Sequence, residues 1–217
     1  MIGYFSRTGT RKNLAELRKR GWGILVSRAG RWNRQDFALW VADCGAWSDF
    51  TAGQDFDEEA FRAFLEWIIE QDVPPQWLVI PDVVGKREDS LALSARWVEI
   101  IRSDPRFDKI PLVLAVQDGM TEQDVRPFIG RIVGLFVGGS TEWKLATKRL
   151  WAAFAHSWGG ICHCARVNSE ERVDECGRDG VDSFDGSGVS RWFVTIGKMD
   201  RARQAAMLWK GQGELFA

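Results

Sequence analysis

The segment 77–84, with the sequence WLVIPDVV, indicates the fold of this chain more directly than any other. Four apolar residues run without a polar interruption, which is typical of a strand whose two faces are both covered in a parallel sheet. The carboxylate of Asp82 follows this run at once, so we expect it at the carboxyl end of the strand. Apolar strands that end in polar side chains are the pattern of a β/α barrel.

The chain repeats this pattern on both sides of segment 77–84. Apolar runs alternate with segments in which apolar residues recur at helical spacing, as Phe61, Leu65 and Ile68 do. Such alternation favours parallel strands joined by helices. Helical spacing recurs at Leu91, Ala95, Val98 and Ile101, and at Trp143, Leu150 and Phe154. The predicted strands are residues 2–6, 22–27, 37–44, 77–84, 112–117, 132–138, 160–167 and 181–186.

Eight strands with intervening helices predict an α/β fold, a compact (β/α)8 TIM-like barrel. The 217 residues suit a single domain, 1–217, close to the lower limit of roughly 200 residues for a complete barrel. An open doubly wound sheet is the alternative. It predicts a glycine-rich phosphate loop after the first strand, and residues 7–10 (RTGT) match such a loop poorly.

Local signals predict where several helices begin and end. Asp57, with acidic residues after it, is typical of a helix N-cap, and Ser169 opens a helix in the same way. The connection 28–36 is too short and too rich in Gly and Arg for a full helix. The last helix is predicted at residues 199–209.

The overall charge does not indicate a nucleic-acid-binding protein, because 29 basic and 30 acidic residues leave a net charge of −1. A local basic face and a solvated surface are equal alternatives for nine side chains in the first 34 residues. Most of the 12 Trp are expected in the core, with Trp47 and Trp143 as candidates to stack on bases. The nine basic residues are Arg7, Arg11, Lys12, Arg18, Lys19, Arg20, Arg28, Arg31 and Arg34.

No apolar run approaches the roughly 18 residues that span a bilayer, and the start of the chain lacks the apolar core of a signal peptide. We therefore expect a cytoplasmic protein with no membrane partner and with four reduced Cys. Cys162 and Cys164 would point to the same side of a strand, while Cys176 falls on the next helix. A zinc site is not expected, nor is any cofactor.

Polar residues follow several predicted strands directly, at the edge where barrel active sites form. A single Asp at a strand end usually caps a helix or makes an Asx turn. That several strands end in this way favours one shared pocket. His163 and Arg166 are candidates for sugar or phosphate contacts, with a satisfied polar pair at the strand end as the equal alternative. The other strand-end residues are Asp43, Asp82, Gln117, Gly138, Gly139, Asn168 and Asp185.

These strand ends resemble the motifs of tRNA-guanine transglycosylases. Residues 41–45 (VADCG) are similar to the aspartate–small–glycine motif of that family. Residues 165–169 (ARVNS) and 180–186 (GVDSFDG) look closer to its phage branch, the deazapurine DNA modification proteins that insert 7-deazaguanines into DNA. The resemblance covers about residues 4–187. Further motifs that match in order are 81–82 (PD), 116–119 (VQDG), 137–140 (VGGS) and 182–185 (DSFD).

The resemblance implies a glycosyltransferase that exchanges guanine in DNA for a 7-deazaguanine such as preQ0 or preQ1. Asp185 would be the nucleophile that forms a covalent glycosyl-enzyme, and Asp43 the general acid/base. Asp82, Gln117 and Gly139 would hold the base, with a backbone N–H after Gly138 near the O6 edge. Retaining glycosidases use paired carboxyl groups by the same logic.

The resemblance also implies the partners. The tRNA enzymes carry a Cys-rich zinc subdomain after the nucleophile strand, whereas residues 187–217 contain no Cys. DNA is therefore the expected substrate and tRNA the less favoured one, in the cytoplasm of a bacterial host if the chain is phage-encoded. A homodimer or an accessory protein that supplies nucleic-acid contacts remains open.

Three other functions stay open. The same pocket suits exchange on tRNA or hydrolysis of a purine glycosidic bond. A barrel that only binds a purine or a modified nucleic acid is a non-enzymatic alternative, which the presence of both Asp43 and Asp185 disfavours. An unrelated phosphate-sugar enzyme predicts a phosphate grip at the last strands, for which residues 186–188 (GSG) are a weak match.

Overall fold

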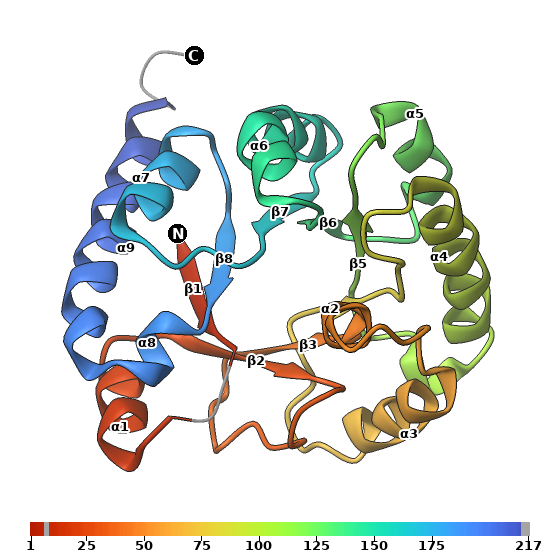
Figure 1. The fold of residues 1–217 in the computed structure, drawn as a ribbon, viewed down its shortest axis with the longest axis horizontal. Helices are drawn as coiled ribbons and strands as arrows, with labels where there is room; N and C mark the ends of the chain where they lie inside the picture. Colours follow the sequence, from red (N-terminus) through yellow and green to blue (C-terminus); the bar gives the residue numbers. More distant parts are fainter. Residues whose placement is uncertain (7–8, 214–217) are drawn as a thin grey trace.

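The structure, a computed structural model, describes residues 1–6 and 9–213. They form a closed barrel of eight parallel strands in the order β1 to β8, surrounded by helices (Figure 1). Strand β8 pairs in parallel with β1 and closes the ring. The predicted α/β class and TIM-like barrel are therefore confirmed, and the open doubly wound sheet is excluded.

All eight predicted strands are present, and each is shorter than its predicted segment. Trp22 and Ile80, for example, are buried but lie just outside the strands. Apolar side chains continue to pack in the core beyond the point where the strand pairing ends. The strands are β1 (Ile2–Phe5), β2 (Gly23–Ser27), β3 (Trp40–Asp43), β4 (Leu78–Val79), β5 (Leu112–Val116), β6 (Gly134–Val137), β7 (Ile161–Cys164) and β8 (Ser183–Gly186).

The helix signals are confirmed at both predicted caps. Asp57 accepts a hydrogen bond from the Ala60 N–H, and Ser169 accepts one from the Arg172 N–H. The connection 28–36 contains no helix, and the last helix begins earlier than predicted. The α-helices are α1 (Arg11–Lys19), α2 (Ala46–Thr51), α3 (Glu58–Ile69), α4 (Arg87–Arg102), α5 (Glu122–Val125), α6 (Thr141–Ser157), α7 (Glu170–Arg178), α8 (Gly188–Arg191) and α9 (Phe193–Gly213), and the 3-10 helices are η1 (Pro105–Phe107) and η2 (Arg126–Phe128).

The buried face of helix α6 differs from the face that its apolar spacing predicts. Leu150, which the spacing places on the buried face, is 50% exposed, whereas Lys144 and Lys148 are buried. Lys144 Nζ donates to the Ala165 carbonyl, and Lys148 Nζ lies 2.8 Å from the Asp179 carboxylate. A buried ammonium group is tolerated when it finds such partners. The side of α6 that carries the two lysines therefore packs against the barrel, and Leu150 faces solvent.

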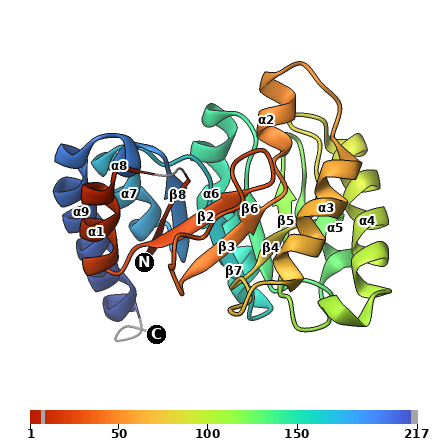
Figure 2. The same cartoon turned by 90° about the horizontal axis from the view of Figure 1, so that it is seen from below.

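Aromatic rings fill the interior of the barrel beneath the strand ends. Tyr4, Trp77, Phe136 and His163 come from different strands or their flanks and contact one another at centroid distances of 4.9–6.2 Å. The interior of a closed barrel of this size is packed with side chains, so any pocket must lie above them. Figure 2 shows the short helix α2, which follows β3 in the chain, at the top of the view and above the strands of the barrel.

Candidate active site

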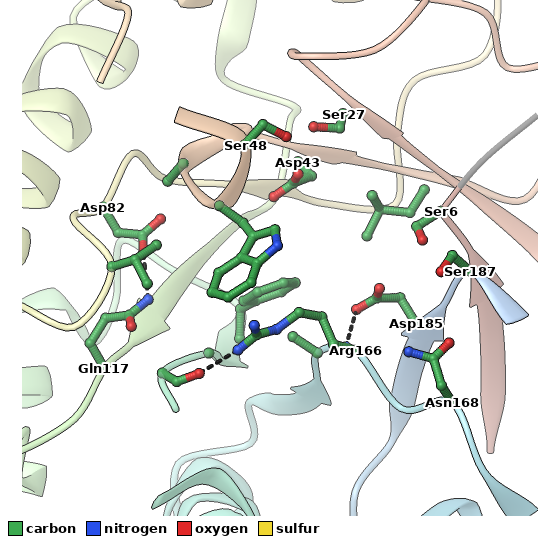
Figure 3. A pocket seen from close by; sticks show the side chains of 18 of the residues that line it. Ser6, Ser27, Asp43, Ser48, Asp82, Gln117, Arg166, Asn168, Asp185 and Ser187 are labelled. Carbon is green, nitrogen blue, oxygen red and sulfur yellow. Dashed lines mark hydrogen bonds between the residues drawn. The ribbon is translucent and has the colours of Figure 1, made fainter. Parts of the chain in front are cut away.

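A hollow of about 360 Å³ opens at the carboxyl ends of the strands (Figure 3). Its volume lies in the range of small-molecule sites, about 300–1,000 Å³. Every strand, or the residues directly after it, contributes to the lining, so the hollow stands on the axis of the barrel. The polar lining residues are Ser6, Ser27, Asp43, Ser48, Asp82, Gln117, Arg166, Asn168, Asp185, Ser187 and Arg191.

Asp185 lies near the end of β8 and points into the hollow (Figure 3). One of its oxygens, Oδ1, is hydrogen-bonded to Nε2 of His163 at 3.2 Å and to the backbone N–H of Arg166 at 3.1 Å. Arg166 has a φ of 56°, which is uncommon for a residue with a Cβ. Conformations of this kind persist where surrounding contacts hold them, often at functional sites.

Asp43 is the last residue of β3 and lies level with Ser27 at the end of β2. Burial raises the pKa of Asp43 to about 6, and the charge of Asp185 adds to the rise. Hydrogen bonds from the Ser27 side chain and the Gly45 backbone act in the opposite direction. A carboxyl group with this pKa exchanges a proton readily near neutral pH, as a general acid/base must.

Asp82 and Gln117 form a buried polar pair on the side of the hollow formed by β4 and β5. Gln117 Oε1 accepts the Gly85 N–H at 3.2 Å, which orients the amide so that Nε2 donates to Asp82 Oδ2 at 2.5 Å. The thiol of Cys44 lies 3.3 Å from Asp82 Oδ1. Burial raises the pKa of Asp82 to about 7, so both the acid and the carboxylate are accessible near neutral pH.

Gly138 and Gly139 follow β6 and need to be glycine for different reasons. A Cβ on Gly138 would lie 2.8 Å from Gln117 Nε2, so a side chain there would displace the amide. Gly139 has a φ of 70°, and a Cβ there would collide with the Asp118 carboxylate and the Trp143 ring. The pair therefore lets backbone atoms line the hollow beside Gln117.

The rim of the hollow combines an aromatic ring with a guanidinium group. Trp47 of α2 is 43% exposed, and the Arg166 guanidinium lies over its ring at 3.8 Å from the centroid. Arg166 also donates to the Gly139 carbonyl. Helix α2 is anchored from below by buried Arg28, which donates to the Cys44 carbonyl at 2.7 Å and pairs with Asp49.

Most of the residues predicted from the sequence meet in this one hollow. His163 does not, since it is fully buried beneath the hollow and contacts Asp185 instead of facing the opening. Burial and the partners of both ring nitrogens favour the alternative expected from the sequence, a satisfied polar side chain at the strand end, and a sugar or phosphate contact of His163 stays a prediction. The predicted residues that line the hollow are Asp43, Asp82, Gln117, Gly138, Gly139, Arg166, Asn168 and Asp185.

Sequence reasoning missed several lining residues. Ser6 and Ser27 end the first two strands, and the rule that sites form at strand ends could have found them. Ser48 lies on the short helix α2, and Arg191 lies on the short helix α8. Neither of these helices has an apolar repeat long enough to be recognised. Trp143 is half-buried against the core and is not among the residues that line the hollow, which favours core packing over base stacking.

Some of the basic residues in the first 34 positions are engaged in ion pairs within the fold and do not belong to a solvent-facing basic surface. Arg20 pairs with Glu16 and Asp200, and Arg28 is buried against Asp49. Arg7 lies outside the described residues. Within the described ranges, no group of three or more His, Cys, Asp or Glu is placed to hold a metal ion.

The same ranges contain no helix with the length and hydropathy needed to cross a bilayer. Comparison with known proteins adds no identification: no family model matches the chain, and no curated protein matches it.

Proposed function

We propose that this protein exchanges guanine in DNA for a 7-deazaguanine through a covalent intermediate on Asp185. The observation that carries the proposal is that Asp43 and Asp185 line one hollow of a size for a small molecule. Paired carboxyl groups across a shared cavity suit the replacement of a glycosidic substituent with retention of configuration. The order of the motifs around them, similar to that of the guanine transglycosylases, supports the same chemistry.

The first half of the reaction forms one bond to the anomeric carbon and breaks another. A carboxylate oxygen of Asp185 attacks the anomeric carbon C1′ of the nucleotide, and the C1′–N9 bond breaks with its electron pair going to guanine. Asp43, in its acid form, donates the proton that the leaving guanine needs. The products are a glycosyl ester on Asp185 and free guanine.

The second half reverses these steps with another base. Asp43, now a carboxylate, removes the N9 proton of the incoming 7-deazaguanine. N9 then attacks C1′ and the ester bond to Asp185 breaks, which restores both carboxyl groups. A pKa of about 6 for Asp43 serves both halves, since neither form is rare near neutral pH.

Asp82 and Gln117 are the proposed contacts for the guanine face. As a carboxylate, Asp82 accepts from both N1–H and the exocyclic amine of the base. The orientation of Gln117 sets an N–H donor beside Asp82, where it can serve the O6 oxygen. Such a set disfavours adenine, which lacks the N1–H and would leave the lone pairs of Asp82 that face the base without a donor.

The rim favours a polymer over a free nucleoside. Exposed Trp47 offers a stacking surface for a neighbouring base, and Arg166 and Arg191 add cationic groups at the same opening. A target base in duplex DNA must leave the stack to reach the hollow. DNA is preferred to tRNA because residues 165–169 and 180–186 are more similar to the phage branch.

The test is incorporation of labelled guanine into duplex DNA, single-stranded DNA or tRNA, with Asp185→Asn as the control. Label that enters DNA and depends on Asp185 supports the proposal, and label in tRNA alone moves the activity to that substrate. Release of guanine without incorporation identifies a glycosidase. No incorporation and no release in any of the three polymers contradicts the proposal.

A further inference from the structure

His163 is the least expected side chain in the interior of the barrel. Its ring stacks on Phe136 at a centroid distance of 4.9 Å and an interplanar angle of 13°, and it also contacts Tyr4 and Trp77. The side chain is fully buried. A polar ring in an aromatic interior is tolerated only if both of its nitrogens find partners.

Both nitrogens of His163 are satisfied by residues of β8. Nδ1 lies 2.9 Å from Ser183 Oγ, and Nε2 lies 3.2 Å from Asp185 Oδ1. A carboxylate can only accept, so Nε2 must carry the hydrogen when Asp185 is ionised. Nδ1 is then the acceptor and receives the Ser183 hydroxyl hydrogen. Asp185 therefore selects the tautomer, and the Ser183 hydroxyl, which can donate as well as accept, satisfies the other nitrogen.

The two oxygens of Asp185 differ in their contacts. In the part of the chain that the structure describes, both hydrogen bonds to this carboxylate end on Oδ1, one from His163 and one from the Arg166 backbone. Oδ2 receives none there. Because Asp185 lines the hollow, Oδ2 keeps its lone pairs for a reacting atom.

We infer that His163 is a positioning residue for the nucleophile, holding Oδ1 of Asp185 so that Oδ2 attacks the anomeric carbon. The inference rests on the proposed function and adds to it a residue that acts only through another. Phe136 lines the hollow and stacks on the imidazole, so His163 does not touch substrate. A fixed carboxylate loses less orientational freedom on the way to the transition state.

The charge state fits this role. Burial lowers the pKa of His163, while Asp185 acts in the opposite direction and Lys144 adds to the lowering. A neutral imidazole donates to the carboxylate without neutralising it through proton transfer. Ser183 and the surrounding rings keep that imidazole in one orientation.

Two variants of His163 distinguish the effect of its hydrogen-bond donor from the effect of its volume. His163→Leu keeps a buried apolar side chain and removes the donor, whereas His163→Gln keeps an N–H near the position of Nε2 and loses the contact to Ser183. Tyr4→Phe serves as the matched control, because it removes only a hydroxyl group from the same aromatic interior. Tyr4 lies level with Asp185 on the neighbouring strand, but neither hydrogen bond to the Asp185 carboxylate in the described part of the chain comes from Tyr4. The melting temperature and folded fraction of each variant are measured first.

The kinetic readout is the rate of covalent capture of DNA per folded molecule, at saturating DNA. A lost hydrogen bond to a charged group predicts a rate about 10- to 100-fold lower in His163→Leu. KM for DNA stays close to that of the wild type, and His163→Gln recovers most of the rate even if it is less stable. A His163→Leu rate equal to wild type, or a His163→Gln rate as low as that of His163→Leu, overturns the inference.

A spectroscopic readout needs no substrate. The chain has only two His, so ¹⁵N-labelled imidazoles can be assigned with His163→Gln. We expect His163 to be neutral at pH 7 with the hydrogen on Nε2, and a hydrogen on Nδ1 alone overturns the inference. If wild type captures neither DNA nor tRNA, the proposed function fails and the inference with it; if wild type captures DNA and His163→Leu does so equally fast, only the inference fails.

Discussion

Asp43 and Asp185 line the same hollow, although β1 and β2 separate their strands in the ring. Burial raises the pKa of Asp43, and the charge of Asp185 adds to the rise. A neighbouring negative charge disfavours the ionised form of a carboxyl group, so Asp43 keeps its proton to a higher pH than an isolated carboxyl group would. The proposed reaction needs different roles of the two groups, because the nucleophile attacks as a carboxylate while the general acid must hold a proton.

The two halves of the reaction should respond to pH in opposite directions. Guanine release uses the acid form of Asp43, whose pKa is about 6, so its single-turnover rate should fall about tenfold for each pH unit well above that value. Attack by the incoming base uses the carboxylate and should quicken as pH rises to about 6. Guanine release from DNA is measured between pH 5 and 8.5. Identical profiles for wild type and Asp43→Asn would remove Asp43 from proton transfer.

Asp82 should make the fold less stable at high pH. Burial raises its pKa from 3.8 to about 7, so the folded state binds more protons than the unfolded state between these values. The free energy of unfolding therefore falls as pH rises through this window and stays low above it. At pH 8 we expect Asp82→Asn to be more stable than wild type by about 1–4 kcal/mol, and at pH 4 we expect no gain.

Urea denaturation at both pH values checks this prediction. Asp124→Asn is the matched control with the opposite sign, because the hydrogen bond from Arg87 lowers the pKa of Asp124. Removing the Asp124 carboxylate should therefore lower stability at pH 8. An Asp82→Asn protein that is no more stable than wild type at pH 8 contradicts the prediction.

Gly139→Ala should abolish exchange for a reason beyond backbone strain. The new Cβ collides with Asp118 and lies 2.8 Å from the Trp143 ring, in the turn whose carbonyl binds Arg166. Gly21→Ala imposes a similar left-handed strain, at a φ of 68°, with nothing within 4 Å of the Cβ. We expect Gly21→Ala to lose about 1–2 kcal/mol of stability from strain alone and Gly139→Ala to lose more because of the collisions, and only Gly139→Ala to lose exchange. Equal exchange rates for the two variants would refute the crowding argument.

Trp47→Ala should weaken DNA binding. Base–aromatic stacking contributes about 1–3 kcal/mol, which corresponds to a rise in Kd of about 5- to 150-fold. The neighbouring Phe50 is 54% exposed but does not line the hollow, so Phe50→Ala is the matched control. Fluorescence anisotropy with a short single-stranded oligonucleotide measures both. A loss of the same size in the two variants would indicate a general effect on α2 and not stacking at the site.

The strands could be predicted because both their faces are buried. Continuous apolar runs such as Leu112–Val116 have no other common explanation, and their number and alternation with helices are enough to indicate a barrel. The face that each helix buries is harder to predict from the sequence. The buried face of α6 includes Lys144 and Lys148, whose partners Ala165 and Asp179 directly follow β7 and α7. A pattern that assumes Lys is exposed could not predict these contacts.

The site could be predicted in part for a geometric reason. In a closed barrel all strands end at one rim, so polar residues after apolar runs converge without any further information. His163 required one more step: Cys162 and Cys164 share a face of β7, so the residue between them points the opposite way, into the barrel. Ser48 and Arg191 lie on α2 and α8, which are too short to show a periodic apolar pattern in the sequence.

The central claim is that Asp185 becomes covalently attached to a sugar of the nucleic acid. It is tested most directly by incubating the protein with guanine-containing DNA in the absence of an incoming base, followed by denaturation, digestion and mass spectrometry. The account predicts a DNA-linked peptide whose modified residue is Asp185, absent from Asp185→Asn and discharged by added guanine or a 7-deazaguanine. An adduct on another residue, an adduct that persists in Asp185→Asn, or none with a protein shown to exchange bases would contradict it.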